Sequence, residues 1–155
     1  LPFQPIISGG PNSANPHAAP SNRPLEAGDL LVIDWGARSN GYCSDLTRTF
    51  GIQHLADEFV EIYTAVQNAN LAGRNAGKPG ISAGEIDKAA RNVIEKAGYG
   101  KFFTHRTGHG LGMEDHETPY IFSENPLLLS EGMTYTVGPG IYLPDRGEYA
   151  LKTTW

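Results

Sequence analysis

The sequence predicts an α+β fold in which an antiparallel sheet carries its helices on one face. Apolar runs of strand type come first, two segments with helical periodicity follow, and further extended runs close the chain. Elements grouped in this order are typical of α+β domains rather than of alternating α/β domains. With 155 residues and a hydrophobic fraction of 39%, the chain is long enough for one core and too short for two. We therefore treat residues 1–155 as a single domain.

A β-hairpin is the clearest local prediction. Residues 30–36 and 42–51 are rich in apolar and β-branched side chains, and the pair Asn40-Gly41 lies between them. Asn-Gly suits a two-residue turn because both of its central residues need a positive φ angle. If these two residues form the loop, the numbers of facing residues sum to 81. A further short strand is expected at residues 3–8, ahead of a proline-rich loop.

This register brings two carboxylates together. Gly36 faces Asp45, and Asp34 lies two residues from Gly36 on the same face, so the Cβ atoms of the two aspartates are diagonal neighbours within roughly 8 Å. Apolar residues occupy both faces of the hairpin, which we therefore expect to be buried on both sides. Two buried carboxylates need a counter-charge. The hairpin alone leaves open whether a lysine, an arginine or a metal ion supplies it.

Two helices are expected in the middle of the chain. Apolar residues recur at helical spacing across residues 57–74. Ser82 and Glu85 have the spacing of a capping box, which predicts a second helix that starts there and stops at Gly98. Beyond the helices we expect a strand at residues 133–137, a Pro-Gly turn and a last extended run.

The composition argues against several classes of function. The net charge is −5 and the sequence pI is near 5.5, so a nucleic-acid partner is not expected. No apolar stretch approaches the roughly 18 residues of a membrane span, and no charged-then-apolar leader opens the chain, so no membrane association is expected. The single cysteine, Cys43, permits no internal disulfide and fits a reducing compartment, which favours a cytoplasmic location.

Three histidines mark a second region of interest. His105, His109 and His116 fall within twelve residues of one another, in a glycine-rich segment rather than on a regular apolar face. Glycine allows backbone and ligand to approach closely, and neutral imidazole is a common metal ligand. A lone histidine would more often have a structural role, whereas this grouping favours a binding site.

Motifs along the chain follow the order found in one known family. They are Pro16-His17 ahead of Gly28-Asp29, Val32-Ile33-Asp34-Trp35-Gly36-Ala37, Ser44-Asp45-Leu46-Thr47-Arg48-Thr49-Phe50, His105-Arg106-Thr107-Gly108-His109-Gly110-Leu111-Gly112, His116-Glu117-Thr118-Pro119, and Glu131-Gly132-Met133 leading to Pro139-Gly140-Ile141-Tyr142. Over nearly its whole length the chain resembles the pita-bread metallopeptidases, in particular their Xaa-Pro aminopeptidase and prolidase branch. Several motifs in order are far more specific than any one alone.

The resemblance implies a fold, a reaction and a metal centre. The fold is the pita-bread (creatinase/aminopeptidase-like) fold, a curved antiparallel sheet with helices on one face, and residues 1–155 would be a partial catalytic domain with an incomplete N-terminal half. Family members remove an N-terminal residue that precedes proline. They use two divalent metal ions, Mn, Co or Zn, which lower the pKa of a bridging water and stabilise the oxyanion. By analogy Asp34 would chelate one ion, Asp45 would bridge both, and His109 would bind the second.

The same resemblance assigns the other histidines to the substrate. His17 and His116 would contact the substrate or assist proton transfer, and His105 would join His116 in binding it. The partner is then a peptide with proline at its second position. Family members carry further helices and a strand before the point that corresponds to Leu1. The sheet should therefore expose surface that favours a homodimer or contact with a missing partner segment.

Two positions depart from the family pattern. Gly138 stands where the family has a metal-binding glutamate that also acts as general base, and Lys152 stands where it has its last ligand glutamate. An ammonium about 4 Å from a divalent ion costs on the order of 8 kcal/mol at an effective dielectric constant of 20. We therefore expect Lys152 to pair with Asp34 and Asp45 in place of the metals, and two-metal hydrolysis to be impaired. Two alternatives remain: a non-catalytic peptide- or protein-binding module, and a metal-free hydrolase of the creatinase type.

Overall fold

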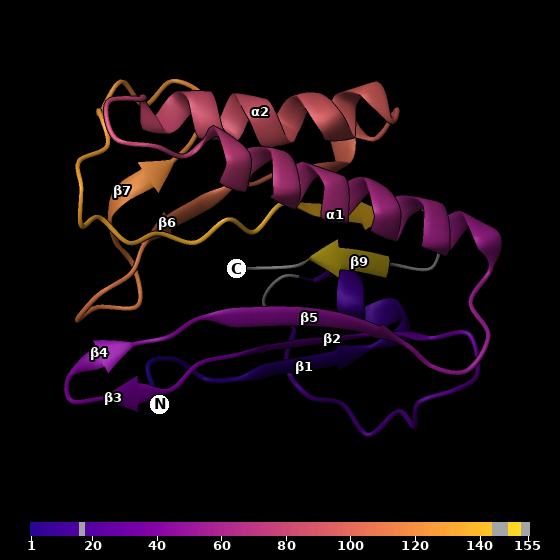
Figure 1. The fold of residues 1–155 in the computed structure, drawn as a ribbon. Coiled ribbons are helices and arrows are strands. Elements are labelled where there is room, and N and C mark those ends of the chain that lie inside the picture. Colours follow the sequence, from indigo (N-terminus) through magenta and orange to yellow (C-terminus); the bar gives the residue numbers. More distant parts are fainter. Residues whose placement is uncertain (16–17, 144–148, 153–155) are drawn as a thin grey trace.

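Helices and strands lie in separate layers. The computed structural model describes residues 1–15 and 18–143 and, for the backbone, residues 149–152. Figure 1 shows the two long helices at one side, short paired strands beneath them, and a three-stranded sheet at the opposite side. Antiparallel strands with the helices gathered on one side confirm the predicted α+β class.

The three-stranded sheet has the order β1-β2-β5, and both of its pairings are antiparallel. Its strands are β1 (Ile6–Gly9), β2 (Leu30–Trp35) and β5 (Leu46–Gly51). The first strand starts three residues later than predicted, because Pro5 has no N–H group to give to a ladder.

The hairpin closes as predicted through a turn at Asn40 and Gly41. These residues have φ angles of 51° and 89°, as a type I′ turn requires, and they join β3 (Arg38–Ser39) to β4 (Tyr42–Cys43). Facing residues sum to 81 along both β2-β5 and β3-β4, which confirms the predicted register.

Two details of the hairpin prediction were wrong. Gly36 and Asp45 do not form a ladder pair, because the ladder is interrupted there and Ser44 N–H donates instead to the carbonyl of Ala37 at 2.8 Å. The sheet is also not buried on both faces, since the helices cover one face only (Figure 1). Asp34 on the inner face is 8% exposed, whereas Phe50 on the outer face is 48% exposed.

Both predicted helices are present, as α1 (Asp57–Ala76) and α2 (Ala83–Lys96). The Ser82 hydroxyl caps α2 by accepting a hydrogen bond from Glu85 N–H at 3.3 Å, and Gly98 follows the helix with a φ angle of 86°. No described helix has the length and apolar character that spanning a membrane would require. Two short 3-10 helices complete the helical elements of the described residues, η1 (Gly10–Ala14) and η2 (Gly100–Phe102).

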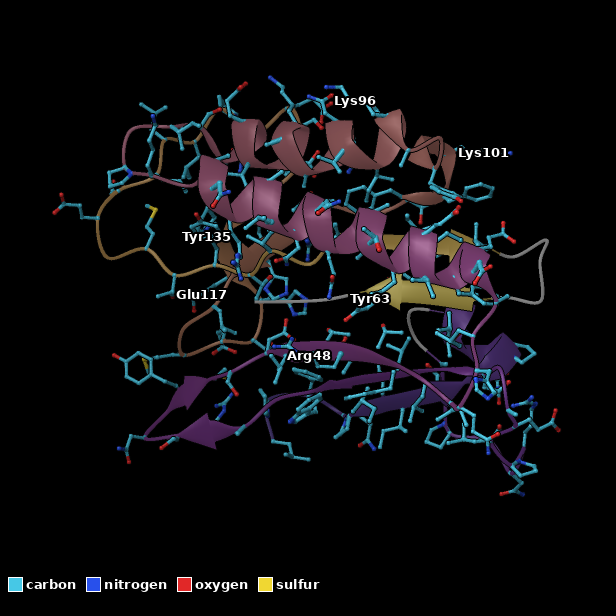
Figure 2. All side chains as sticks on the ribbon, turned by 45° about the vertical axis from the view of Figure 1, so that its right-hand side comes forward. Arg48, Tyr63, Lys96, Lys101, Glu117 and Tyr135 are labelled. Carbon is cyan, nitrogen blue, oxygen red and sulfur yellow. The ribbon has the colours of Figure 1, made fainter. Side chains whose placement is uncertain are left out.

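The core joins the two helices to the strands beneath them. Tyr63 of α1 is partly buried and packs against the larger cluster, whereas Lys96 and Lys101 lie at the outer side of the helical layer (Figure 2). Burial of such clusters is worth about 1.5–3 kcal/mol for each large apolar side chain. The larger cluster comprises Leu30, Ile62, Ala65, Val66, Ala69, Ala90, Ile94, Phe103, Ile141 and Leu143, and a second comprises Ala83, Ile86, Ile121, Leu129 and Val137.

The predicted strand at residues 133–137 is an extended segment without a regular ladder. It runs beside β6 (Gly108–Gly110), but the only bridge assigned to it among the described residues joins Tyr135 to Gly110. His109 N–H donates to the side-chain hydroxyl of Thr136 at 3.2 Å, so a side chain takes the place of a regular ladder bond there. The remaining described strands are β6 (Gly108–Gly110), β7 (Glu117–Ile121), β8 (Gly140–Leu143) and β9 (Tyr149–Lys152).

Candidate functional site

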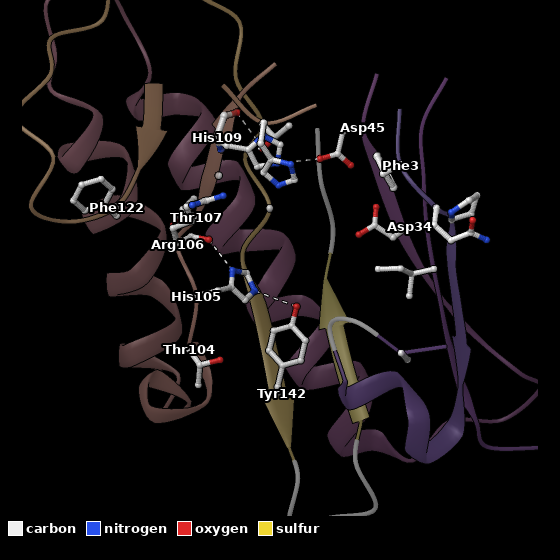
Figure 3. Close-up of a pocket in the computed structure, with 18 of the residues that line it drawn as sticks. Phe3, Asp34, Asp45, Thr104, His105, Arg106, Thr107, His109, Phe122 and Tyr142 are labelled. Atoms are coloured by element: carbon white, nitrogen blue, oxygen red, sulfur yellow. Dashed lines mark hydrogen bonds and ion pairs between the residues drawn. The ribbon is translucent and has the colours of Figure 1, made fainter. Parts of the chain in front are cut away.

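A cavity of about 930 Å³ separates the histidine-rich segment from the three-stranded sheet. Figure 3 shows His105, Arg106 and His109 on one wall, with Phe3, Asp34 and Asp45 on the other. The volume lies in the range of sites for small molecules and short peptides. Further lining residues are Gln4, Pro5, Ile6, Ala18, Ala19, Pro20, Thr104, Thr107, Gly108, His116, Phe122, Thr136, Gly138 and Tyr142.

The two predicted carboxylates both reach this cavity. Asp34 projects from the inner face of β2, next to the end of that strand, and is buried. Asp45 precedes β5, and its side chain is 9% exposed. Their placement follows from the register of the hairpin and places two negative groups on one wall of the cavity.

His109 faces Asp45 across the cavity. Its ring Nε2 lies 3.3 Å from Asp45 Oδ2, and its Nδ1 lies 3.0 Å from the carbonyl oxygen of Gly110. A carbonyl only accepts, so Nδ1 is the nitrogen that donates. Nε2 and the carboxylate oxygen of Asp45 then face each other as two acceptors, and a proton or a cation between them would give each acceptor a partner.

The glycines around His109 have a different role from the one expected. A Cβ atom at Gly108 would collide with the carbonyl oxygen of Thr136, and one at Gly110 would collide with the carbonyl of Thr118. The close approach is therefore between neighbouring backbone segments, which pack on both sides of β6. A register shift between His109 and Gly110 breaks the β6-β7 ladder, and such irregularities commonly re-aim a side chain next to a site.

His116 is stacked on His109. Their ring centroids are 3.9 Å apart at an interplanar angle of 29°, and His116 Nδ1 lies 3.4 Å from Asp115 Oδ2. Burial first, and then the nearby charge of His109, lower the pKa of His116 below its usual value, although Asp115 opposes the shift. His116 is therefore neutral at pH 7 and available to accept a proton.

His105 is held in one orientation by two hydrogen bonds. Its Nδ1 donates to the carbonyl of Arg106 at 2.6 Å, which leaves Nε2 to accept from the Tyr142 hydroxyl at 3.1 Å. Burial, and to a smaller extent the charge of Asp34, raise the pKa of Tyr142, so its hydroxyl keeps its proton. Tyr142 was quoted in a motif but given no role by the sequence analysis. The sequence did offer a signal for Tyr142: it lies at every second position from Gly138 and Gly140 in an extended segment, so it shares their face.

Arg106 lines the cavity, although the sequence motif that contains it predicted no role for it. Its guanidinium lies 4.6 Å from the ring centroid of Tyr120. It is the only lysine or arginine among the lining residues in the described ranges, and no carboxylate of those ranges lies within ion-pair distance of it. The cavity therefore has a positive group on the wall opposite Asp34 and Asp45 (Figure 3).

The structure says less about the three other predicted positions, Gly138, Lys152 and His17. Gly138 is buried in the cavity wall and donates its N–H to the carbonyl of Thr107 at 2.7 Å, so this position offers no side-chain ligand. The backbone of Lys152 pairs with Gly140 across β8-β9, but its side chain lies outside the described residues. His17 lies outside them as well. The ion pair of Lys152 with the aspartates therefore stays a prediction.

The side chains that the structure describes around this cavity do not fit a centre with two divalent ions. Asp34 and Asp45 carry two negative charges against the four positive charges of such a pair, and Gly138 adds none. Within residues 1–15 and 18–143, no three His, Cys, Asp or Glu side chains are grouped so that they could hold a metal ion. A two-metal site requires bridging and terminal ligands for both ions, and this set of donors is too small.

Comparison with known proteins identifies the family. The model of metallopeptidase family M24 matches residues 1–154. The chain belongs to this family. The M24 chain is also 44% identical over 142 residues to the Xaa-Pro dipeptidase of Lactobacillus delbrueckii subsp. lactis, an alignment that covers 92% of this chain and 39% of that protein.

Solved structures agree with this assignment. A dipeptidase from Pyrococcus horikoshii OT3 matches with a TM-score of 0.95 and 46% identity, over 99% of this chain and 42% of that one. The X-Pro aminopeptidase of Thermotoga maritima MSB8 matches with a TM-score of 0.93 and 38% identity, over 99% of this chain and 43% of that one. These matches confirm the predicted pita-bread fold. The M24 chain spans about two-fifths of the length of these relatives.

Proposed function

We propose that the cavity binds dipeptides of the Xaa-Pro type and that hydrolysis by two metal ions is impaired in this chain. The observation that carries the proposal is the separation of charge across the cavity. Asp34 and Asp45 lie on one wall and Arg106 lies on the other. A free dipeptide is a zwitterion of matching polarity. Its carboxylate would face Arg106. Its ammonium would face the aspartates, whose two negative charges leave one for the ligand beside the predicted ammonium of Lys152.

The proline ring has an apolar surface to contact. Phe3, Pro5 and Ile6 line the wall that also carries Asp34, and Phe122 reaches the cavity while 40% exposed. A pyrrolidine ring has no N–H group within a peptide bond and buries well against such side chains. The relatives named for Xaa-Pro substrates support this choice of ligand.

The impaired hydrolysis follows from the chemistry of the donor set. Gly138 can neither bind a metal ion nor act as a base, and two aspartates with one imidazole do not balance two divalent charges. His109, His116 and Asp45 remain close together, and they suit binding and proton exchange better than activation of water by metals.

Two measurements test the proposal. Isothermal titration calorimetry with Ala-Pro should show saturable binding, and Pro-Ala should bind more weakly. Incubation of the same complex with Mn²⁺ should release free proline no faster than buffer containing the metal alone. Absence of Ala-Pro binding would overturn the assigned ligand. Rapid release of proline would overturn the impaired hydrolysis.

A further inference from the structure

A buried ion pair lies directly behind the histidine wall of the cavity. Asp87 and Arg91 stand four residues apart on α2, with Arg91 Nε 2.9 Å from Asp87 Oδ2 and Arg91 Nη2 3.2 Å from Asp87 Oδ1. The side chain of Asp87 is fully buried and that of Arg91 is 24% exposed. Neither residue lines the cavity.

Arg91 binds the backbone of the wall. Its Nη1 donates to the carbonyl of Phe103 at 2.9 Å, and its Nη2 donates to the carbonyl of His105 at 2.9 Å. The guanidinium also lies 4.1 Å from the ring centroid of Phe103, whose edge meets the ring of His105 with centroids 5.2 Å apart. Arg91 therefore contacts the backbone of His105 directly and its ring through the ring of Phe103.

Asp87 binds the same segment two residues further on. Its Oδ1 accepts hydrogen bonds from Thr107 N–H at 3.0 Å and from the Thr107 hydroxyl at 2.7 Å. Its Oδ2 also accepts from the hydroxyl of Ser123, just beyond β7. Burial alone would raise the pKa of Asp87, but hydrogen bonds from Arg91, Ser123 and Thr107 lower it, so the carboxylate is ionised.

Most hydrogen bonds of this ion pair have a shared target. A buried ion pair is often no more stabilising than apolar residues of the same volume, because both charges lose their hydration. Here four hydrogen bonds of the pair reach one irregular segment, residues 103–107, that has no regular ladder of its own, and a fifth joins Asp87 to Ser123. The bonds fix the direction of that segment, and the next two residues are Gly108 and His109 of the cavity wall.

We propose that Asp87 and Arg91 are positioning residues for the cavity: they hold residues 103–107 against α2, and thereby orient His105 and His109 toward the ligand. The inference deepens the proposed function and rests on it. Release of the segment would let His105 exchange its Tyr142 hydrogen bond for other partners and would lower the affinity for the dipeptide.

The test uses substitutions that keep the fold. Arg91→Lys retains the positive charge, but its three donors on one nitrogen cannot reproduce the four hydrogen bonds that three guanidinium nitrogens make to Asp87 and the two carbonyls. Thr107→Val removes a single hydroxyl donor and tests the same clamp if the lysine variant does not fold. Lys88→Ala is the matched control, because it breaks an exposed ion pair with Glu85, 2.8 Å long, on the same helix.

Two readouts separate positioning from mere stability. Nitrogen chemical shifts of the His105 ring should show the Nδ1–H form in the wild type and in Lys88→Ala, and a mixture of forms in Arg91→Lys. The Kd for Ala-Pro should rise roughly tenfold in Arg91→Lys and by less in Thr107→Val. A lower thermal midpoint with unchanged His105 shifts and unchanged Kd would overturn the inference.

The two proposals fail in distinguishable ways. If the wild type binds no Ala-Pro, the proposed function fails, and the His105 shifts alone decide the positioning role. Wild-type shifts retained in both Arg91→Lys and Thr107→Val would then refute it. Altered shifts in either variant, with the control unchanged, would support it.

Discussion

Arg106 offers the sharpest test of how the cavity recognises its ligand. The substitution Arg106→Gln removes the positive charge and keeps a side chain of similar length. Two unit charges 4 Å apart interact with about 4 kcal/mol at an effective dielectric constant of 20. Arg106 is exposed, so solvent screening reduces the expected contribution to about 0.2–1 kcal/mol. That range corresponds to a Kd about 1.4- to 5-fold higher.

The assay is a thermodynamic cycle with two ligands. Calorimetry compares wild type and Arg106→Gln with Ala-Pro, whose carboxylate is free, and with Ala-Pro amide, which is neutral at that end. We expect the loss of affinity only for the free acid, because the amide has no charge for Arg106 to meet. An equal loss for both ligands would refute the pairing of Arg106 with the carboxylate.

Three further predictions address packing, pH and charge. Gly108→Ala should lower the free energy of unfolding in urea by about 1–3 kcal/mol, because the new Cβ would meet the Thr136 carbonyl. Gly80 has open space and a φ angle of 85°, so Gly80→Ala should lower it by about 1 kcal/mol. Equal losses in the two variants would contradict the packing argument. His116 has a lowered pKa in the folded state, so the free energy of unfolding should fall as the pH drops from 6.5 through that pKa. The variant His116→Asn should lose this part of the pH dependence. The same pH dependence in the variant and the wild type would refute the role of His116. The double variant Gly138→Glu with Lys152→Glu should gain Mn²⁺ binding by equilibrium dialysis, and failure to gain any would count against the ligand analogy.

The local parts of the fold were predictable because short-range chemistry fixes them. Asn40 and Gly41 tolerate the positive φ angles of the turn, and that turn alone sets the register. Ser82 and Glu85 likewise define the start of α2. The segment at residues 133–137 was predicted less well, because its pairing depends on a side chain of Thr136 that bonds across to His109.

The candidate site was predictable in part for a similar reason. Motif order brought Asp34, Asp45 and His109 to notice, and the structure places all three in one cavity. Tyr142 and Arg106 were missed, because their roles depend on which groups lie opposite them across the cavity. Sequence spacing does not encode such relations between distant segments, and the role of each side chain becomes visible only once the segments are packed.

Metal stoichiometry decides whether the side chains of this cavity can hold two divalent ions, which we propose they cannot. The purified chain is incubated with excess Mn²⁺ or Co²⁺, freed of unbound ions by gel filtration, and analysed by inductively coupled plasma mass spectrometry. We expect fewer than two tightly bound ions per chain, with no proline released from Ala-Pro. Two ions bound tightly to each chain would contradict this proposal.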